Sequence, residues 1–201
     1  MKMQQNNNFI EEVEKYVGKL LEKLPAELCY HNLKHTLEVV EASKNLAVES
    51  GLSAEHTEIV IIAAWFHDCG HTITYFGHEE AGMEIAKNFL NKIEYPSDHT
   101  QEVLRCIACT KYPSQPQNEM QKVLCDADMF HLTFDDYEYR SMKLKEELEA
   151  VTHKEIPFQH WCDTNLEFLE DHCYFTNYGK KILTFFKESN LKKFLHDYCN
   201  H

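Results

Sequence analysis

The stretch that decides the fold is IIAAWFHDCGH, residues 61–71. Its first six residues are all apolar, and with Ile59 they predict a helix over about 54–68 that ends at His67 and Asp68. At that end the free carbonyl groups and the negative end of the helix dipole repel a carboxylate. A cation between the imidazole of His67 and the carboxylate of Asp68 would remove this repulsion. The simpler alternative is that Asp68 caps the following loop while His67 faces water.

Apolar residues recur at helical spacing along almost the whole chain, whereas strand-like alternation is absent over any useful length. The 201 residues include only six glycines and five prolines, which suits helices better than a turn-rich β-sandwich. We therefore predict an all-α fold in one domain spanning 1–201. The expected helices cover about 9–24, 32–50, 54–68, 78–92, 98–111, 118–130, 152–169 and 179–198, the seventh starting at a capping box of Thr152 and Glu155.

The composition limits the partners. The net charge of −13 comes from 20 basic and 33 acidic residues, so a basic patch large enough for double-stranded nucleic acid or an anionic membrane is not expected. A small phosphorylated substrate remains possible because a bound dication would reverse the charge locally. Residues 1–8 lack the apolar core of a signal peptide, and no apolar run is long enough to span a bilayer, which favours a cytoplasmic protein.

The eight cysteines are expected to be reduced and mostly buried. Cys106 and Cys109 have the spacing of half a zinc site, but no second half follows at a suitable distance. Apolar side chains on the last helix would either close the core or support a homodimer.

Two further segments carry chemistry. His31 and His35 are four residues apart and would share one face of a helix. In LCDADMF, Asp126 and Asp128 differ by about 200° around a helix, so only one of them can face a given site. Carboxylates beside imidazoles suit Mn, Fe, Zn, Ni, Co or Mg.

The order of these motifs resembles the HD superfamily of metal-dependent phosphohydrolases. YHNLKHTLEVV is similar to the opening helix motif of that family and of the related cyclic-nucleotide phosphodiesterases. AAWFHDCGH resembles the HD helix, and LCDADMF the closing aspartate helix. The resemblance covers about residues 30–130 and implies a helical bundle, to which 135–201 would add C-terminal helices of a bacterial-type subgroup.

Carried over by position, the resemblance implies four metal ligands: His35, His67, Asp68 and Asp128. His31 stands where the phosphodiesterases place a histidine that protonates the leaving oxygen. Binuclear members add two further histidines. His78 matches the first, whereas Cys109, Thr110, Lys111 and Tyr112 stand where the second is expected, so a second ion rests on Asp68 and His78.

These residues together lead to the hypothesis of metal-assisted hydrolysis of a phosphoester of a small molecule, plausibly a nucleotide. His31 or His71 would act as general acid, although His71 could equally be an ordinary loop histidine. Lys111 and Arg140 are candidates for binding a second phosphate, and Tyr75 for lining the pocket. The alternatives are a metal- or nucleotide-binding sensor without turnover, and a di-iron oxygenase of the HD type.

Overall fold

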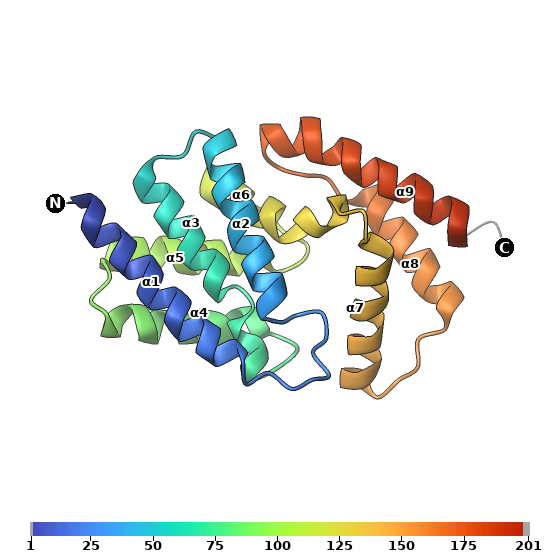
Figure 1. Cartoon of the computed structure of the whole chain (residues 1–201), viewed down its shortest axis with the longest axis horizontal. Helices are drawn as coiled ribbons and strands as arrows, with labels where there is room; N and C mark the ends of the chain where they lie inside the picture. Colours follow the sequence, from blue (N-terminus) through green and yellow to red (C-terminus); the bar gives the residue numbers. More distant parts are fainter. Residues whose placement is uncertain (1, 199–201) are drawn as a thin grey trace.

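The computed structural model describes residues 2–198, with side chains from residue 9 to residue 196. This part of the chain is helical and contains no strand, which confirms the predicted all-α class (Figure 1). Its α-helices are α1 (Lys2–Leu21), α2 (Leu33–Glu49), α3 (Ala54–Phe66), α4 (His78–Lys92), α5 (Ser97–Thr110), α6 (Glu119–Asp128), α7 (Tyr137–Thr152), α8 (Phe158–Asp171) and α9 (Thr184–Tyr198). Three short helical turns join them: η1 (Cys69–Thr72), η2 (Met129–Thr133) and η3 (Gly179–Leu183).

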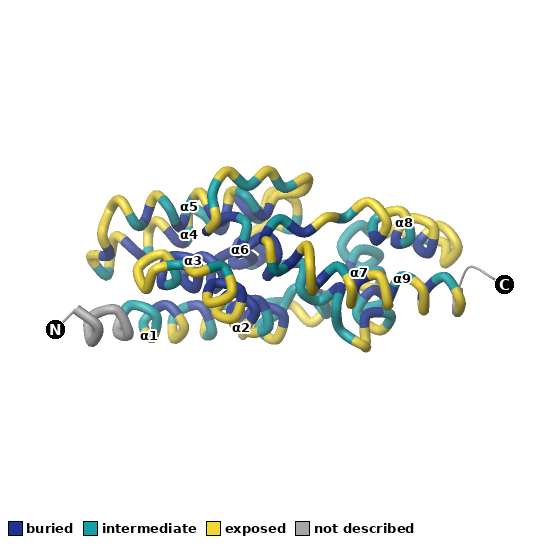
Figure 2. The backbone as a smooth tube through the Cα atoms, turned by 90° about the horizontal axis from the view of Figure 1, so that it is seen from above, coloured by how far each residue is buried: buried dark blue, intermediate teal, exposed yellow. Residues whose placement is uncertain are grey.

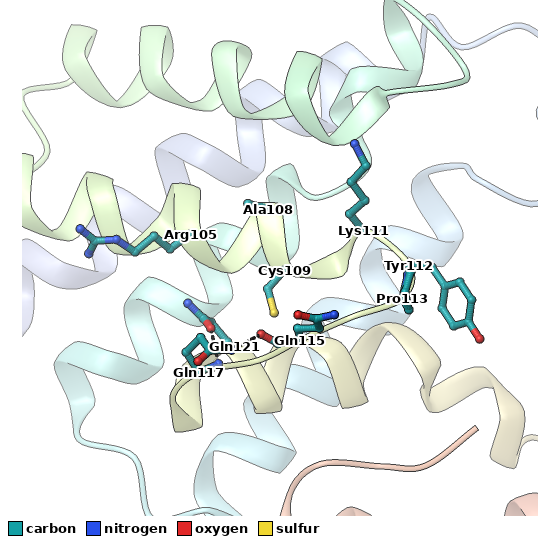
Figure 3. Close-up of a pocket in the computed structure, with 9 residues that line it drawn as sticks. All are labelled: Arg105, Ala108, Cys109, Lys111, Tyr112, Pro113, Gln115, Gln117 and Gln121. Atoms are coloured by element: carbon teal, nitrogen blue, oxygen red, sulfur yellow. Dashed lines mark hydrogen bonds between the residues drawn. The ribbon is translucent and has the colours of Figure 1, made fainter. Parts of the chain in front are cut away.

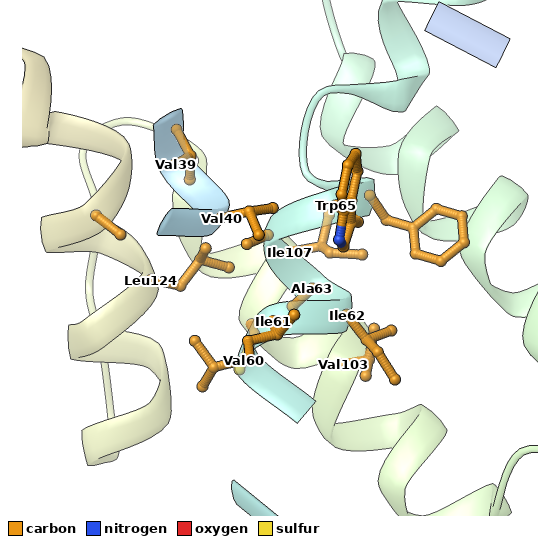
Figure 4. Close-up of a cluster of buried hydrophobic side chains, with 14 of the residues drawn as sticks. Val39, Val40, Val60, Ile61, Ile62, Ala63, Trp65, Val103, Ile107 and Leu124 are labelled. Atoms are coloured by element: carbon orange, nitrogen blue, oxygen red, sulfur yellow. The ribbon is translucent and has the colours of Figure 1, made fainter. Parts of the chain in front are cut away.

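Helix α3 is the centre of the larger part of the molecule. Its residues from Glu58 to Phe66 are all buried, because a helix that is apolar on every side must be covered on every side. Helices α1, α2, α5 and α6 contact it. Figure 4 shows the side chains of α2, α5 and α6 that surround it, among them Val40, Ile107 and Leu124.

Helices α7, α8 and α9 form a second group beside the first (Figures 1 and 2). A smaller apolar cluster lies among them and η2, formed by Leu132, Tyr137, Cys162, Leu169 and Phe194. Buried polar contacts add to this packing: the Asn190 side chain on α9 donates to the carbonyl groups of Leu132 (2.8 Å) and Phe134 (2.9 Å).

The predicted capping box of Thr152 and Glu155 is wrong. Thr152 is the last residue of α7, and its hydroxyl donates to the Leu148 carbonyl one turn earlier. His153 follows with a positive φ of 54°, which ends the helix, and the next helix begins only after Pro157. The sequence pattern merged the end of α7 with α8 because both sides of the break are rich in polar helix formers. Over the described residues, no helix is long and apolar enough to cross a membrane.

Candidate metal centre

Three packed helices bring four polar side chains to one point. His35 lies in the first turn of α2, where the Asn32 side chain accepts hydrogen bonds from the backbone N–H groups of Lys34 and His35. His67 and Asp68 follow the last residue of α3, and Asp128 is the last residue of α6. Because α2, α3 and α6 contact one another, these helix ends meet.

The distances are those of a compact donor set. His35 Nε2 lies 3.4 Å from Asp68 Oδ2 and 3.4 Å from Asp128 Oδ1. His67 Nε2 lies 3.1 Å and 3.6 Å from the same two oxygens. Ligand atoms of His35, His67 and Asp128 fall within 4.8 Å of one another, so this group could hold a metal ion.

The orientation of His67 is fixed by the backbone. Its Nδ1 lies 2.7 Å from the Ala64 carbonyl, which can only accept, so Nδ1 carries the hydrogen and Nε2 presents a lone pair to the site. Metal-binding histidines commonly donate their second ring N–H in this way. His67 Nε2 and Asp68 Oδ2 are both buried without a hydrogen-bond partner. Two buried acceptors that face each other call for a cation between them, and the residues therefore fit a metal ion.

The charges of the site lead to the same conclusion. Burial opposes protonation of His67, but the carboxylates of Asp68 and Asp128 outweigh it and raise its pKa to about 9, so without a metal ion a proton takes the place at Nε2 that the ion would occupy. Burial alone would raise the pKa of Asp68, yet the neighbouring His67 holds that pKa well below its usual range. The carboxylates thus favour a positive charge at this point.

The second oxygen of Asp68 faces a different set of histidines. His78 Nε2 lies 3.5 Å from Asp68 Oδ1, and His71 Nε2 lies 3.9 Å from it. The ring of His71 is stacked between those of His31 and His78, with centroid distances of 4.6 Å and 3.9 Å. His31, Asp68 and His71 form a second group that could hold a metal ion.

The histidines around Asp68 Oδ1 can be compared with the second metal site that the resemblance implied. The structure brings His78 to Asp68, as the resemblance implied, and adds His71, which the sequence left as either a pocket residue or a loop residue. His71 is buried and neither of its ring nitrogens has a partner. At positions 109–112 no imidazole is present, and the residues of this segment that line the cavity near Asp68 are Thr110 and Tyr112.

Comparisons with known proteins agree with this geometry. The model of the HD domain family matches residues 32–133, which contain His35, His67, Asp68 and Asp128. The chain belongs to the HD domain family. Members of this family are generally metal-dependent phosphohydrolases.

Two relatives of this HD domain protein are informative about fold. A crystal structure from Lactobacillus plantarum, solved in a structural genomics programme, aligns over 96% of this chain and 97% of its own, with a TM-score of 0.67 and 15% identity. The alignment thus includes the C-terminal helices. An uncharacterised protein of Clostridium beijerinckii is 33% identical over 72 residues, which are 34% of this chain and 45% of that protein.

A buried glutamate from outside the matched region enters the site. Glu147 on α7 is fully buried and accepts hydrogen bonds from the backbone N–H groups of Tyr30 (2.7 Å) and His31 (3.0 Å). Its other oxygen pairs with His31 Nδ1 and accepts from the Tyr75 hydroxyl (3.1 Å). Sequence analysis missed Glu147, because KLKEELEA is typical of a solvent-exposed helix and lies more than 110 residues from His31.

The three substrate candidates do not line the cavity over the site. This cavity, of about 280 Å³, is lined by His31, His35, Asp68, His78 and Asp128 among others. Lys111 is not in its wall; its ammonium group is half-exposed and pairs with Glu80. Arg140 pairs with Glu38 and Asp136, and Tyr75 is held by Glu147, both also outside this wall.

Lys111 instead borders a separate hollow between α5 and α6, where its side chain extends toward α4 (Figure 3). Cys109 also lines this hollow, with its sulfur 3.6 Å from that of Cys125. Both thiols are free, and Cys106 is buried in the core. Neither of the two candidate metal groups among the described residues includes a cysteine.

Asp126 holds a neighbouring segment in place. This agrees with the helix geometry, which allows only one of Asp126 and Asp128 to face the candidate metal site. It points away from Asp128 and accepts three hydrogen bonds from the segment before η3: from the backbone N–H groups of Phe175 (2.8 Å) and Thr176 (2.9 Å), and from the Thr176 hydroxyl (2.7 Å). The two aspartates of the Asp-Ala-Asp motif therefore have different roles. Asp128 belongs to the donor set, and Asp126 anchors the C-terminal helices.

Proposed function

We propose that this HD domain protein is a phosphohydrolase that cleaves a phosphoester of a small molecule with the help of a divalent metal ion. The observation that supports it best is the shared carboxylate of Asp68, which faces His35 and His67 with one oxygen and His71 and His78 with the other. His35, His67, Asp68 and Asp128 would hold the first ion. His71 and His78 would hold a second ion through the other oxygen of Asp68. A bound ion of this kind polarises a phosphoryl oxygen and lowers the pKa of a water ligand.

His31 is the residue that we assign to the leaving oxygen. Glu147 pairs with Nδ1 of His31 and also fixes the backbone of this residue. His31 lines the cavity, and its Nε2 atom is the ring nitrogen that remains available to a bound molecule. An imidazole whose Nδ1 is held by a carboxylate can donate a proton from Nε2 and be protonated again afterwards. His71 has no such partner on either nitrogen, so we assign it to cation binding instead.

The test is the substitution Asp68→Ala. We expect the purified variant to lose most of its bound transition metal, measured by mass spectrometry, and its phosphohydrolase activity together, since both donor groups depend on this carboxylate. Asp98→Ala is the matched control, because Asp98 is 83% exposed on α5. Full metal retention in Asp68→Ala would contradict the ligand assignment. A metal-loaded wild-type protein that is inactive on every phosphomonoester and cyclic nucleotide would favour the sensor alternative.

A further inference from the structure

The cavity over Asp68 shares a wall with a second hollow between α7 and α8, which we call the annex pocket. Four residues line both spaces: Tyr30, His131, Leu144 and Phe168. The annex pocket is further lined by Tyr137, Ser141, Trp161, Thr164 and Asn165. Because the two hollows share these four side chains, they lie next to each other.

The annex pocket has the size and the wall of a site for a flat ring. Its volume is about 200 Å³, and a cavity of roughly 150 Å³ is enough to admit benzene. Four aromatic side chains contribute to the wall: Tyr30, Tyr137, Trp161 and Phe168. Aromatic walls favour stacked or edge-on contact with another ring.

The polar groups of Tyr137, Ser141, Trp161 and Asn165 in this wall are hydrogen-bonded to one another. Asn165 Oδ1 accepts from the hydroxyl groups of Tyr137 (3.0 Å) and Ser141 (2.9 Å). The indole N–H of Trp161 donates to Ser141 Oγ (2.9 Å), and the Asn165 amide donates to the Trp161 carbonyl (2.9 Å). A ligand rich in hydroxyl groups, such as a sugar, would find few free hydrogen-bond partners here. A flat apolar ring needs no such partners.

The cavity over the metal ligands also limits how many phosphate groups a bound molecule can carry. No Lys or Arg is among the described residues that line it, and Glu79 adds a further acid to the wall. A single phosphate could be neutralised by metal ions on the histidines and aspartates. A second phosphate would have no cationic side chain to meet and would face the carboxylate instead.

From these contacts we infer that the annex pocket binds a flat aromatic group of the substrate's alcohol part, and that the substrate is a phosphomonoester with one phosphate. This inference rests on the proposed phosphohydrolase function, because the phosphate end is placed by the metal ligands. It narrows the substrate class and disfavours sugar phosphates and polyphosphates.

The experiment measures binding of two phosphonates, whose P–C bond resists hydrolysis, to the Mn²⁺-loaded protein by calorimetry. We expect naphthylmethylphosphonate to bind at least tenfold more tightly than methylphosphonate. Thr164→Phe should remove this preference and leave methylphosphonate unchanged. Thr164 is exposed at the rim of the annex pocket, and its hydroxyl bonds only to carbonyl groups of its own helix. Glu170→Phe is the control, since Glu170 is exposed on the opposite side of α8.

The possible outcomes distinguish the inference about the annex pocket from the proposed phosphohydrolase function. Equal affinity for both phosphonates in the wild-type protein, or a preference that survives in Thr164→Phe, would overturn the annex pocket while metal-dependent phosphonate binding still supports the phosphohydrolase. Absence of binding of either phosphonate to the metal-loaded protein would overturn both.

Discussion

Glu147 shows how a single residue outside the motifs of the HD domain contributes to the site. It is a fully buried carboxylate, which would be unfavourable without partners, and it has four: two backbone N–H groups, the His31 ring and the Tyr75 hydroxyl. Burial by itself raises the pKa of Glu147, but the hydrogen bond and charge of His31 together with the two backbone N–H groups outweigh it, and the pKa is lowered. Glu147 is therefore a charged positioning residue for His31.

This role predicts a leaving-group effect in Glu147→Gln. The amide keeps the size of the side chain but no longer stabilises a protonated His31. We expect kcat for benzyl phosphate, whose alkoxide must be protonated, to fall about 10²-fold. The loss for p-nitrophenyl phosphate should be much smaller because its leaving group needs no proton. Steady-state kinetics on both esters measures the difference, and bound metal should stay at the wild-type level.

Glu146→Gln is the matched control, because Glu146 is exposed on the same helix and pairs only with Lys143 at the surface. Equal losses on the two esters in Glu147→Gln would show that Glu147 supports the fold alone.

At the scale of elements, the contact between α6 and the start of η3 decides where the C-terminal helices sit. Asp126 takes its three hydrogen bonds from residues 175 and 176, and Gly179 packs directly against it. A Cβ atom at Gly179 would lie 2.4 Å from Asp126 Oδ2 and 2.7 Å from Tyr174 Cβ. Since α6 also ends in Asp128, this junction couples the C-terminal helices to the candidate metal ligands.

Gly179→Ala should therefore destabilise the protein, by about 1–3 kcal/mol as is usual for overpacking. Urea unfolding followed by circular dichroism measures it. Gly18→Ala is the control, because Gly18 lies within α1 with nothing within 4 Å of an added Cβ. Alanine there should be neutral or stabilise by about 0.5–1 kcal/mol through helix propensity. A Gly179→Ala variant as stable as the wild-type protein would mean that the junction relaxes freely.

For the whole molecule, the important feature is the unequal size of the two apolar clusters. The larger one fills the space around α3, whereas the one among η2, α7, α8 and α9 is built on five buried residues. Figure 2 shows the buried backbone concentrated in the first group of helices. The C-terminal helices supply Glu147 and most of the annex pocket, so local opening of this group would weaken the site without unfolding the core.

Hydrogen exchange should show this difference. We expect amides of α8 and α9 to exchange through openings of lower free energy than amides of α3, because less apolar surface holds them. Mass spectrometry of peptic peptides measures both groups in one sample. Added Mn²⁺ should slow exchange at the ends of α2, α3 and α6 more than in α9. Uniform protection of all helices would show that the chain opens as one cooperative unit.

Much of the fold and part of the site follow from local patterns. The apolar run before His67 requires a central helix, and the 200° offset between Asp126 and Asp128 requires that they face different places, as they do. The resemblance to the HD family implied His35, His67, Asp68 and Asp128 as one set of metal ligands, and the helix ends bring these side chains close together. The predicted helices follow from local patterns because helical geometry relates neighbouring residues by fixed angles.

The features that the sequence did not reveal depend on contacts between distant parts of the chain. Nothing near Glu147 distinguishes it from the other acids of α7, and nothing near His71 shows that it stacks between His31 and His78. The same holds for the annex pocket, whose wall is assembled from residues 30 to 168. The sequence by itself determined the helices and the order of the candidate ligands. Only the packing of α7 and α8 beside the HD core decided which carboxylate holds His31 and placed the annex pocket next to the site.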